Sequence, residues 1–365
     1  MKIKTITCHD VYNLGASLQA YALQNYLLSL GHEVEIIHYK PDYLSNHHKL
    51  WLVANPKFNK PFIKQLYLLA KLPGRLIALK RKKVFDKFTS KYLRLTRRYN
   101  SYEELKKDAP KADCYIAGSD QIWNTLFRNG RDAAFYLDFG NQNTKRISYA
   151  ASFATPEIVP EYRKFVEEKL KRIDYISIRE RISLPLLESL GRKDGVAVCD
   201  PVFLLNKSEW EQNIECDKYK QPYILVYLTN KSSLIENIAK IVAQRTGWKI
   251  YLVGAIRERY ANKCFINVGP FDFVRLIRDS KFVISNSFHA TAFSIIFDKN
   301  FCVVNREDNI NERMLSILKD FGLTDRLITK YDNDILNNID YSLIVTKKES
   351  IINFSKEWLN NSIDR

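Results

Sequence analysis

Apolar runs of strand length alternate with segments of helical periodicity along most of the chain. This alternation predicts parallel sheets whose strands are joined by crossover helices. The first set of predicted strands covers Lys2–Thr7, Glu33–His38, Cys114–Ala117, Arg146–Ala150, Tyr175–Ile178 and Val196–Cys199. After a polar stretch the rhythm restarts, with predicted strands at Tyr223–Leu228, Lys249–Val253, Phe282–Ser285 and Phe301–Val304 and a helix at Ser232–Thr246.

The two sets of strands predict an α/β protein with two Rossmann-like domains. We place the first domain at residues 1–207, with a basic helical insertion at about 43–100, and the second domain at residues 208–340. A helix predicted at Glu349–Asn360, within residues 341–365, is expected to pack back on the first domain. The length of 365 residues agrees with this division, because single hydrophobic cores rarely grow beyond about 300 residues.

The composition is 46% hydrophobic and 27% charged, which excludes a disordered or collagen-like chain. The longest uncharged run, Val11–Gly31, contains Asn13, Gln19 and other polar side chains, so no membrane span is predicted. No apolar core of a secretory signal follows Lys2 and Lys4, and we therefore expect a cytoplasmic protein. The cysteines are scattered without a Cys-x-x-Cys pair, which favours buried thiols over a zinc site or disulfides.

The formal charge of +16 is concentrated in one segment. Residues 57–98 hold 14 Lys and Arg and a single acid, Asp86, so the rest is nearly neutral and no nucleic-acid partner is expected. Apolar residues in this segment predict basic amphipathic helices that break near Pro73-Gly74. Such helices suit an anionic membrane surface. The alternative is a solvated helical hairpin whose apolar stripe packs on its own domain.

Ligands of doubly wound sheets bind beyond the carboxyl ends of the strands. After the first predicted strand, Val11–Gln19 opens a helix in which Gly15 permits close backbone approach. Free amides at the start of this helix attract a phosphate or a carboxylate. We take Asn13, Gly15 and Gln19 as candidate substrate-binding residues, although any turn from a strand to a helix can need a glycine.

A second polar segment, Ile116–Asn124, follows an apolar strand. Asp120 is a candidate base toward a hydroxyl, the side-chain amides can bind sugar hydroxyls, and Trp123 offers a flat apolar face. The candidate substrate-binding residues of this segment are Gly118, Ser119, Gln121, Trp123 and Asn124. The alternative is that Ser119-Asp120 caps a helix and that Trp123 is a core side chain.

Two more strands end in candidate anion-binding side chains. Arg179 follows one of them and can hold an anion bidentately, while a surface ion pair with Glu180 or Glu188 is the alternative. His289 follows the other, where an imidazole beside a helix N-terminus can bind an anion or transfer a proton. A histidine satisfied by backbone carbonyls is the alternative for this position.

Together these segments resemble the polysaccharide pyruvyl transferase family, in the order that the family has them. The resemblance spans about residues 5–305 and leaves out the basic insertion and the C-terminal segment. It rests on Tyr12-Asn13-Leu14-Gly15-Ala16-Ser17-Leu18-Gln19-Ala20-Tyr21-Ala22-Leu23, Gly118-Ser119-Asp120-Gln121-Ile122-Trp123-Asn124, Ser177-Ile178-Arg179-Glu180, Asp200-Pro201-Val202-Phe203 and Ser287-Phe288-His289-Ala290-Thr291.

The resemblance implies a fold like that of GT-B glycosyltransferases, with the active site between the two domains. It implies transfer of the pyruvyl group of phosphoenolpyruvate onto two hydroxyls of a sugar, forming a cyclic ketal without a metal or cofactor. Arg179 and His289 then contact phosphoenolpyruvate, and Asp120 or a neighbour deprotonates the acceptor. The implied acceptor is a precursor of a bacterial capsule or other cell-surface glycan, carried on a lipid diphosphate, and the basic segment then holds the enzyme at the cytoplasmic leaflet.

One position departs from the family. Well-studied relatives have an arginine two residues before this histidine, whereas the present chain has Ser287. Either another basic residue such as Arg257, Arg259 or Arg306 compensates, or the donor differs. The alternatives are a GT-B glycosyltransferase that uses a nucleotide sugar and a non-catalytic partner in glycan assembly.

Overall fold

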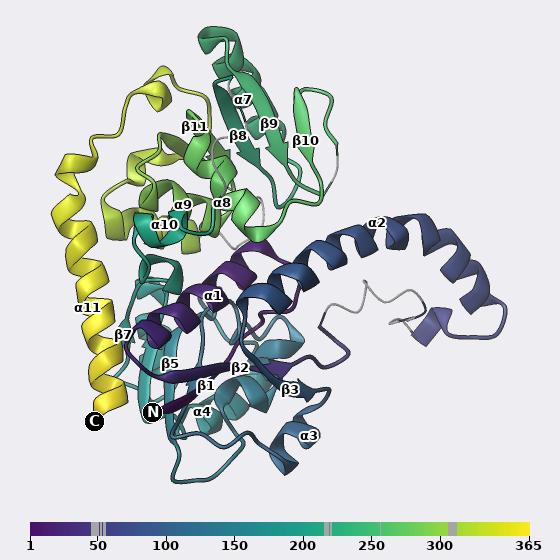
Figure 1. Ribbon diagram of the computed structural model, residues 1–365, viewed down its shortest axis with the longest axis vertical. Helices are drawn as coiled ribbons and strands as arrows, with labels where there is room; N and C mark the ends of the chain where they lie inside the picture. Colours follow the sequence, from purple (N-terminus) through teal and green to yellow (C-terminus); the bar gives the residue numbers. More distant parts are fainter. Residues whose placement is uncertain are drawn as a thin grey trace.

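The computed structural model describes residues 1–44, 51, 53, 56–214, 219, 221–255, 257–305 and 312–365. Figure 1 shows its two parallel β-sheets, one above the other, with helices packed against each. The first sheet has the strand order β3-β2-β1-β4-β5-β6-β7. These strands are β1 (Lys2–Ile6), β2 (Glu33–Tyr39), β3 (Leu95–Tyr99), β4 (Cys114–Ala117), β5 (Lys145–Ala151), β6 (Tyr175–Ile178) and β7 (Val196–Ala197).

The second sheet has the strand order β10-β9-β8-β11-β12-β13. Its strands are β8 (Tyr223–Tyr227), β9 (Lys249–Val253), β10 (Lys263–Phe265), β11 (Phe282–Ser285), β12 (Phe301–Val304) and β13 (Leu327–Ile328). The pairings within both sheets are parallel, with helical connections between most strands. The predicted α/β fold with two Rossmann-like domains is therefore confirmed, while the domain boundaries at 207/208 and 340/341 remain predictions.

Most of the predicted strands agree with the observed bounds to within one residue at each end, and β4, β6, β9, β11 and β12 match residue for residue. Strand β7 is shorter than predicted, because the amide of Cys199 donates to Ser355 Oγ at 2.9 Å and not to a neighbouring strand. Strands β3, β10 and β13 were not predicted. Strand β3 reads LTRRY and lies at the sheet edge, where solvent-facing arginines replace the apolar run of an inner strand.

Helix α1 (Leu14–Ser29) is apolar on nearly all sides, which is typical of a helix covered from several directions. It packs on the first sheet and also touches α8 of the second domain. The other α-helices are α2 (Ile63–Tyr92), α3 (Tyr102–Lys107), α4 (Arg163–Leu170), α5 (Leu184–Ser189), α6 (Lys207–Glu211), α7 (Ser233–Thr246), α8 (Pro270–Asp279), α9 (Phe288–Ile296), α10 (Glu312–Phe321) and α11 (Val345–Asp364).

The basic insertion is one long helix and not a hairpin broken near Pro73-Gly74, as the sequence had indicated. Helix α2 runs through Pro73 and curves away from the body of the protein (Figure 1). Proline removes one helical hydrogen bond and bends a helix without necessarily ending it. Across this point the Arg75 guanidinium lies 5.9 Å from the Tyr67 ring, a contact that spans the bend. The alternative, in which the apolar stripe packs on its own domain, does not hold for the distal half, where Leu66 and Leu69 are exposed.

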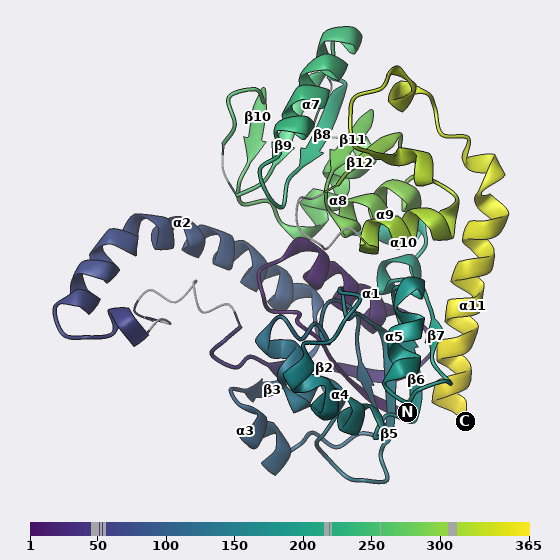
Figure 2. The ribbon, with the colours of Figure 1, turned by 180° about the vertical axis from the view of Figure 1, so that it is seen from behind.

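Helix α11 returns from the second domain and lies along the first (Figure 2). Asn360 Oδ1 accepts a hydrogen bond from Tyr26 at 3.1 Å, and the Lys145 ammonium donates to the carbonyl of Ile363. Leu359 and Ile363 are buried in this contact. The last helix therefore ties the end of the chain to both α1 and β5.

The described cysteines are free thiols. Cys8, Cys114, Cys199 and Cys302 are buried and Cys264 is half-buried, while Cys216 lies outside the described residues.

Candidate functional site

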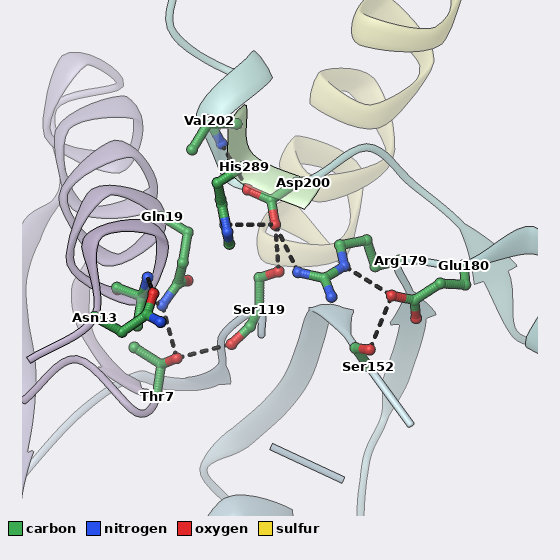
Figure 3. A network of polar contacts seen from close by, with 11 residues as sticks. Thr7, Asn13, Gln19, Ser119, Ser152, Arg179, Glu180, Asp200, Val202 and His289 are labelled. Atoms are coloured by element: carbon green, nitrogen blue, oxygen red, sulfur yellow. Dashed lines mark hydrogen bonds and ion pairs between the residues drawn. The ribbon is translucent and has the colours of Figure 1, made fainter. Parts of the chain in front are cut away.

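The polar segments singled out in the sequence follow β1, β4, β6 and β11, each at the carboxyl end of its strand. Because parallel strands end at the same edge of a sheet, these segments meet where the two domains face each other. Figure 3 shows the result, with side chains from α1, from the loops of the first sheet and from α9 converging on one another. A small hollow lies beside them, lined from the first domain by Arg179 and Asp200 and from the second by Phe288 and Asp320.

Asp200 is the centre of the arrangement. Its Oδ2 accepts hydrogen bonds from Ser119 Oγ at 2.9 Å and from Arg179 Nη1 at 3.0 Å, and its Oδ1 accepts from the amide of Val202 at 3.1 Å. His289 Nε2 lies 3.7 Å from Oδ2, which is an ion-pair separation and not a hydrogen bond. We call Ser119, Arg179, Asp200 and His289 the Asp200 cluster.

The guanidinium of Arg179 is buried among two carboxylates and an aromatic ring. Its Nε donates to Glu180 Oε1 at 2.8 Å, and Ser152 Oγ donates to the same oxygen at 2.9 Å. The Arg179 Cζ lies 4.2 Å from the ring of Phe288, which belongs to α9 of the second domain. The ion pair with Glu180 does form, but it is buried and not at the surface, and Asp200 is a further partner.

Charge pairing dominates the electrostatics of the cluster. Burial alone raises the pKa of Asp200, but the interaction with His289 and the charge of Arg179 outweigh burial and hold that pKa well below its usual range. Asp200 is therefore ionised at neutral pH and neutralises part of the positive charge that faces it.

Gly15 is required by close contact with His289. A Cβ built on Gly15 would lie 1.9 Å from His289 Nδ1 and 2.3 Å from Cγ, distances that no pair of non-bonded atoms tolerates. The backbone of α1 and the imidazole of α9 thus touch across the domain interface. This contact is a physical reason for glycine at this position and supports the reading of Val11–Gln19 as part of the site.

Several buried polar atoms around the cluster have no hydrogen-bond partner. Buried polar groups are nearly always paired, so a group of unpaired atoms in one place points to a ligand, a water or a catalytic role. These atoms are Ser17 Oγ, Gln19 Oε1, Arg179 Nη2, Glu180 Oε2 and His289 Nε2, and the last of them has only the ion-pair contact with Asp200.

The N-terminus of α1 faces the same place. Asn13 caps the helix by accepting a hydrogen bond from the amide of Ala16 at 3.2 Å, and Gln19 Nε2 donates to Thr7 Oγ1 at 2.9 Å. The amides of Leu14 and Gly15, at the first two helical positions, have no carbonyl partner within the helix. The side chain of Asn13 is exposed, whereas that of Gln19 is fully buried. The Oε1 atom of Gln19 has no hydrogen-bond partner and is therefore available to accept a hydrogen bond from a ligand.

Asp120 has an unusual backbone. Its φ of 75° lies in the left-handed region, and the residue bridges to Ala151 beside β4 and β5. The side chain is half-buried, its charge acts on Arg179, and among the described residues it forms no hydrogen bond or ion pair. No helix follows it, so the alternative that Ser119-Asp120 caps a helix is wrong, and strain of this kind is typical of functional positions.

Trp123 does not lie in the site. Its side chain is fully buried, its Nε1 donates to the carbonyl of Phe135 at 3.0 Å, and it stacks on Tyr136. The structure therefore corrects the prediction of a sugar-binding face and supports the alternative of a core residue. Asn124 Nδ2 donates a hydrogen bond to Gln121 Oε1 at 3.0 Å, within the turn that follows β4. The amide of Gly118 donates to the carbonyl of Ile6 and so extends the pairing of β4 with β1.

Ser287 is the N-cap residue of α9 and is buried. Of the cations expected to replace the family's arginine, Arg257 and Arg259 are exposed on the connection between β9 and β10, two strands away from β11. Arg306 lies outside the described residues.

Sequence reasoning did not single out Asp200 as a site residue, although its motif was part of the resemblance. The signal was present, because an aspartate before Pro201 at the end of an apolar strand is one of the carboxyl-end positions at which ligands bind. Among the described residues, no three His, Cys, Asp or Glu side chains gather as a metal site.

Comparison with known proteins agrees with this geometry. Residues 13–309 match the family described as polysaccharide pyruvyl transferase. The chain belongs to this family. Members of this family are transferases. The fold is of the GT-B type. A comparison with curated proteins found no match by sequence.

Two solved structures show how far the fold is shared. UDP-GlcNAc 2-epimerase from Neisseria meningitidis, bound to UDP-GlcNAc, is 10% identical with a TM-score of 0.50, and the match covers 100% of this chain and 99% of that one. A putative UDP-N-acetylglucosamine 2-epimerase from Listeria monocytogenes is 12% identical with a TM-score of 0.50, covering 100% and 89%. At this identity the likeness shows the fold alone.

Proposed function

We propose that this polysaccharide pyruvyl transferase moves the pyruvyl group of phosphoenolpyruvate onto two hydroxyls of one sugar residue. The observation that carries the proposal is the meeting of Arg179 from the first domain and His289 from the second on Asp200. A small anion with a phosphate and a carboxylate fits a place where a guanidinium, an imidazole and a helix N-terminus converge.

The reaction sets clear requirements. The methylene carbon of phosphoenolpyruvate gains a proton, the adjacent carbon becomes cationic, two hydroxyl oxygens bond to it, and the bond to the phosphate oxygen breaks. Of the two hydroxyl protons, one balances the proton given to the methylene carbon and the other leaves with the phosphate. The chemistry needs an acid, a base and stabilisation of the leaving phosphate, and it needs no cofactor.

We assign these tasks to residues of the cluster and its neighbour. Arg179 uses Nε and Nη1 for two carboxylates, which leaves the unpaired Nη2 for the phosphate or carboxylate of the donor. His289 binds the phosphate and supplies the proton to the methylene carbon. Asp120, whose carboxylate is unpaired among the described residues, takes the proton of the acceptor hydroxyl.

The test is mass spectrometry of candidate lipid-linked glycans after incubation with the protein and phosphoenolpyruvate. We expect a pyruvyl group on the glycan and an equal amount of phosphate released, dependent on both substrates. Glycosyl transfer from a nucleotide sugar in the same mixture would favour the glycosyltransferase alternative. Binding of the donor without phosphate release in the presence of acceptors would favour a non-catalytic partner in glycan assembly.

We also propose that the distal half of α2 binds an anionic membrane surface, where a lipid-linked acceptor lies. Leu66, Leu69 and Leu76 share one side of this helix at helical spacing, and the first two are 68% and 65% exposed. Lysines and arginines flank this stripe, a charge pattern that complements anionic lipid headgroups. No helix in the described part of the chain is long and apolar enough to span a bilayer.

Vesicle sedimentation tests this proposal. We expect the protein to bind vesicles that contain phosphatidylserine at low salt. The double variant Leu66→Ser/Leu69→Ser should bind at least about tenfold more weakly, because it lacks two leucines that membrane binding would bury. Leu343→Ser, at an exposed leucine far along the chain from α2, is the control and should bind like the wild type. Equal binding by all three proteins would contradict the membrane role of α2.

A further inference from the structure

Helix α2 brings one of its cations to the interface between the two domains. Arg81 is half-buried, and its Nε donates to the carbonyl of Tyr12 at 3.0 Å. Its Cζ lies 5.1 Å from the ring of Phe85, which in turn contacts the ring of Tyr12 edge to face. The guanidinium is therefore held in one place, on the loop between β1 and α1, and does not move freely in solvent.

That loop leads directly to the Asp200 cluster. Tyr12 stands three residues before Gly15, and Gly15 is the residue on which the ring of His289 packs. Arg81 thus enters the interface on the same loop that contacts the proposed acid. The C-terminal part of α2 continues past α1, which it touches through the rings of Tyr21 and Phe88.

The second domain also packs against this part of α2, because a Cβ built on Gly269, just before α8, would lie 3.3 Å from Val84 Cγ1. Burial raises the pKa of Tyr227 in the second domain, and the positive charge of Arg81 partly offsets that rise. Tyr227 is the last residue of β8 and pairs with Ser285 of β11, whose Oγ donates to its carbonyl at 2.9 Å. Ser285 is two residues from Ser287, the position at which the chain departs from the family.

The outer nitrogens of the Arg81 guanidinium are available as hydrogen-bond donors. Among the residues that the structure describes, its Nη1 and Nη2 make no hydrogen bond, and no carboxylate pairs with it. The neighbouring Lys82 differs, because it is paired with Asp86 within the helix. A fixed guanidinium with its outer nitrogens unoccupied is the arrangement that binds a phosphate or carboxylate.

We propose that Arg81 binds the anionic donor, in place of the arginine that the family's relatives have where this chain has Ser287. This inference rests on the proposed function and deepens it, because it assigns the second cation of the donor site. It also makes α2 part of that site, so that one helix carries both the membrane-facing stripe and a donor-binding side chain.

Isothermal titration of the full chain with phosphoenolpyruvate tests the inference. We expect Arg81→Ala to bind the donor roughly tenfold to a hundredfold more weakly, the effect of one charge-assisted contact. Lys83→Ala, at an exposed cation two residues away, should bind like the wild type. The double variant Arg81→Ala/Ser287→Arg should regain part of the affinity, because it returns a cation to the family's position.

The outcomes separate the two proposals. If the wild type binds phosphoenolpyruvate and Arg81→Ala binds it equally well, the role of Arg81 is overturned and the proposed function stands. If the wild type does not bind the donor at all, both are overturned. Arg81→Gln keeps the aliphatic stem and a donor for the Tyr12 carbonyl, so a loss of affinity in this variant, with an unchanged melting temperature, excludes misfolding as the cause.

Discussion

Replacing Arg179 with alanine is expected to abolish most activity and to destabilise the fold. The change leaves Asp200 and Glu180 buried without their shared cation, and removal of one member of a buried ion pair costs about 3–5 kcal/mol. Turnover should fall at least about a hundredfold, the low end for the loss of a positioned charge. Urea unfolding and phosphoenolpyruvate-dependent phosphate release measure the two effects.

The loss of Arg179 should also change how the stability of the fold depends on pH. In the wild type the pKa of Asp200 is held well below its usual range, so its contribution to stability is complete above about pH 4 and is lost only as the pH falls through the lowered value. Without Arg179 that pKa rises, and acid unfolding should begin at a higher pH. An unchanged acid limb in Arg179→Ala would contradict the charge pairing.

Two variants serve as references for Arg179→Ala. Arg179→Lys keeps a charge but not the fork that reaches both carboxylates, so it should be more stable than Arg179→Ala and still lose most activity. Lys240→Ala breaks an exposed pair with Glu236 and should change the free energy of unfolding by less than about 1 kcal/mol. Comparable destabilisation in Lys240→Ala and Arg179→Ala would show that burial of the cluster contributes nothing.

The sequence predicted the location of the site better than the ion pairs and hydrogen bonds that its side chains form with one another. The apolar runs placed Arg179 and His289 after the carboxyl ends of β6 and β11, and that placement follows from the alternation of such runs with helical segments. It did not reveal that Asp200 joins them, because Asp200 meets Arg179 through residues far apart in the sequence of the first domain and meets His289 only where the two domains face each other. Local patterns carry no information about such a long-range arrangement.

Trp123 and Pro73 show two other limits. A tryptophan within a polar segment can face a ligand or the core, and only the turn that directs it toward Tyr136 decides between them. Pro73-Gly74 predicts a break from local propensity, yet α2 continues on both sides of it. In the same segment, nothing distinguishes Arg81 from the other cations until Tyr12 and Phe85 are seen to hold it.

Gly15→Ala is expected to inactivate the protein through His289. The added Cβ would stand 1.9 Å from Nδ1 and 2.5 Å from Cε1, so the imidazole must turn away from Asp200 or α1 must shift. A displaced imidazole cannot serve as the proposed acid, and turnover should fall at least about a hundredfold, as we expect for His289→Ala. Gly74→Ala is the matched control, because nothing lies within 4 Å of its Cβ and the helix should gain slightly in stability.

A double-mutant cycle tells whether the two residues act together. If Gly15 matters only because the ring of His289 packs on it, the variant Gly15→Ala/His289→Ala should be no less active than His289→Ala alone. If the fold-losses of turnover in the two single variants instead multiply in the double variant, Gly15 has a separate task, such as presenting its backbone amide to the donor. The contact across the interface would then be a by-product of that task and not the reason for glycine at this position.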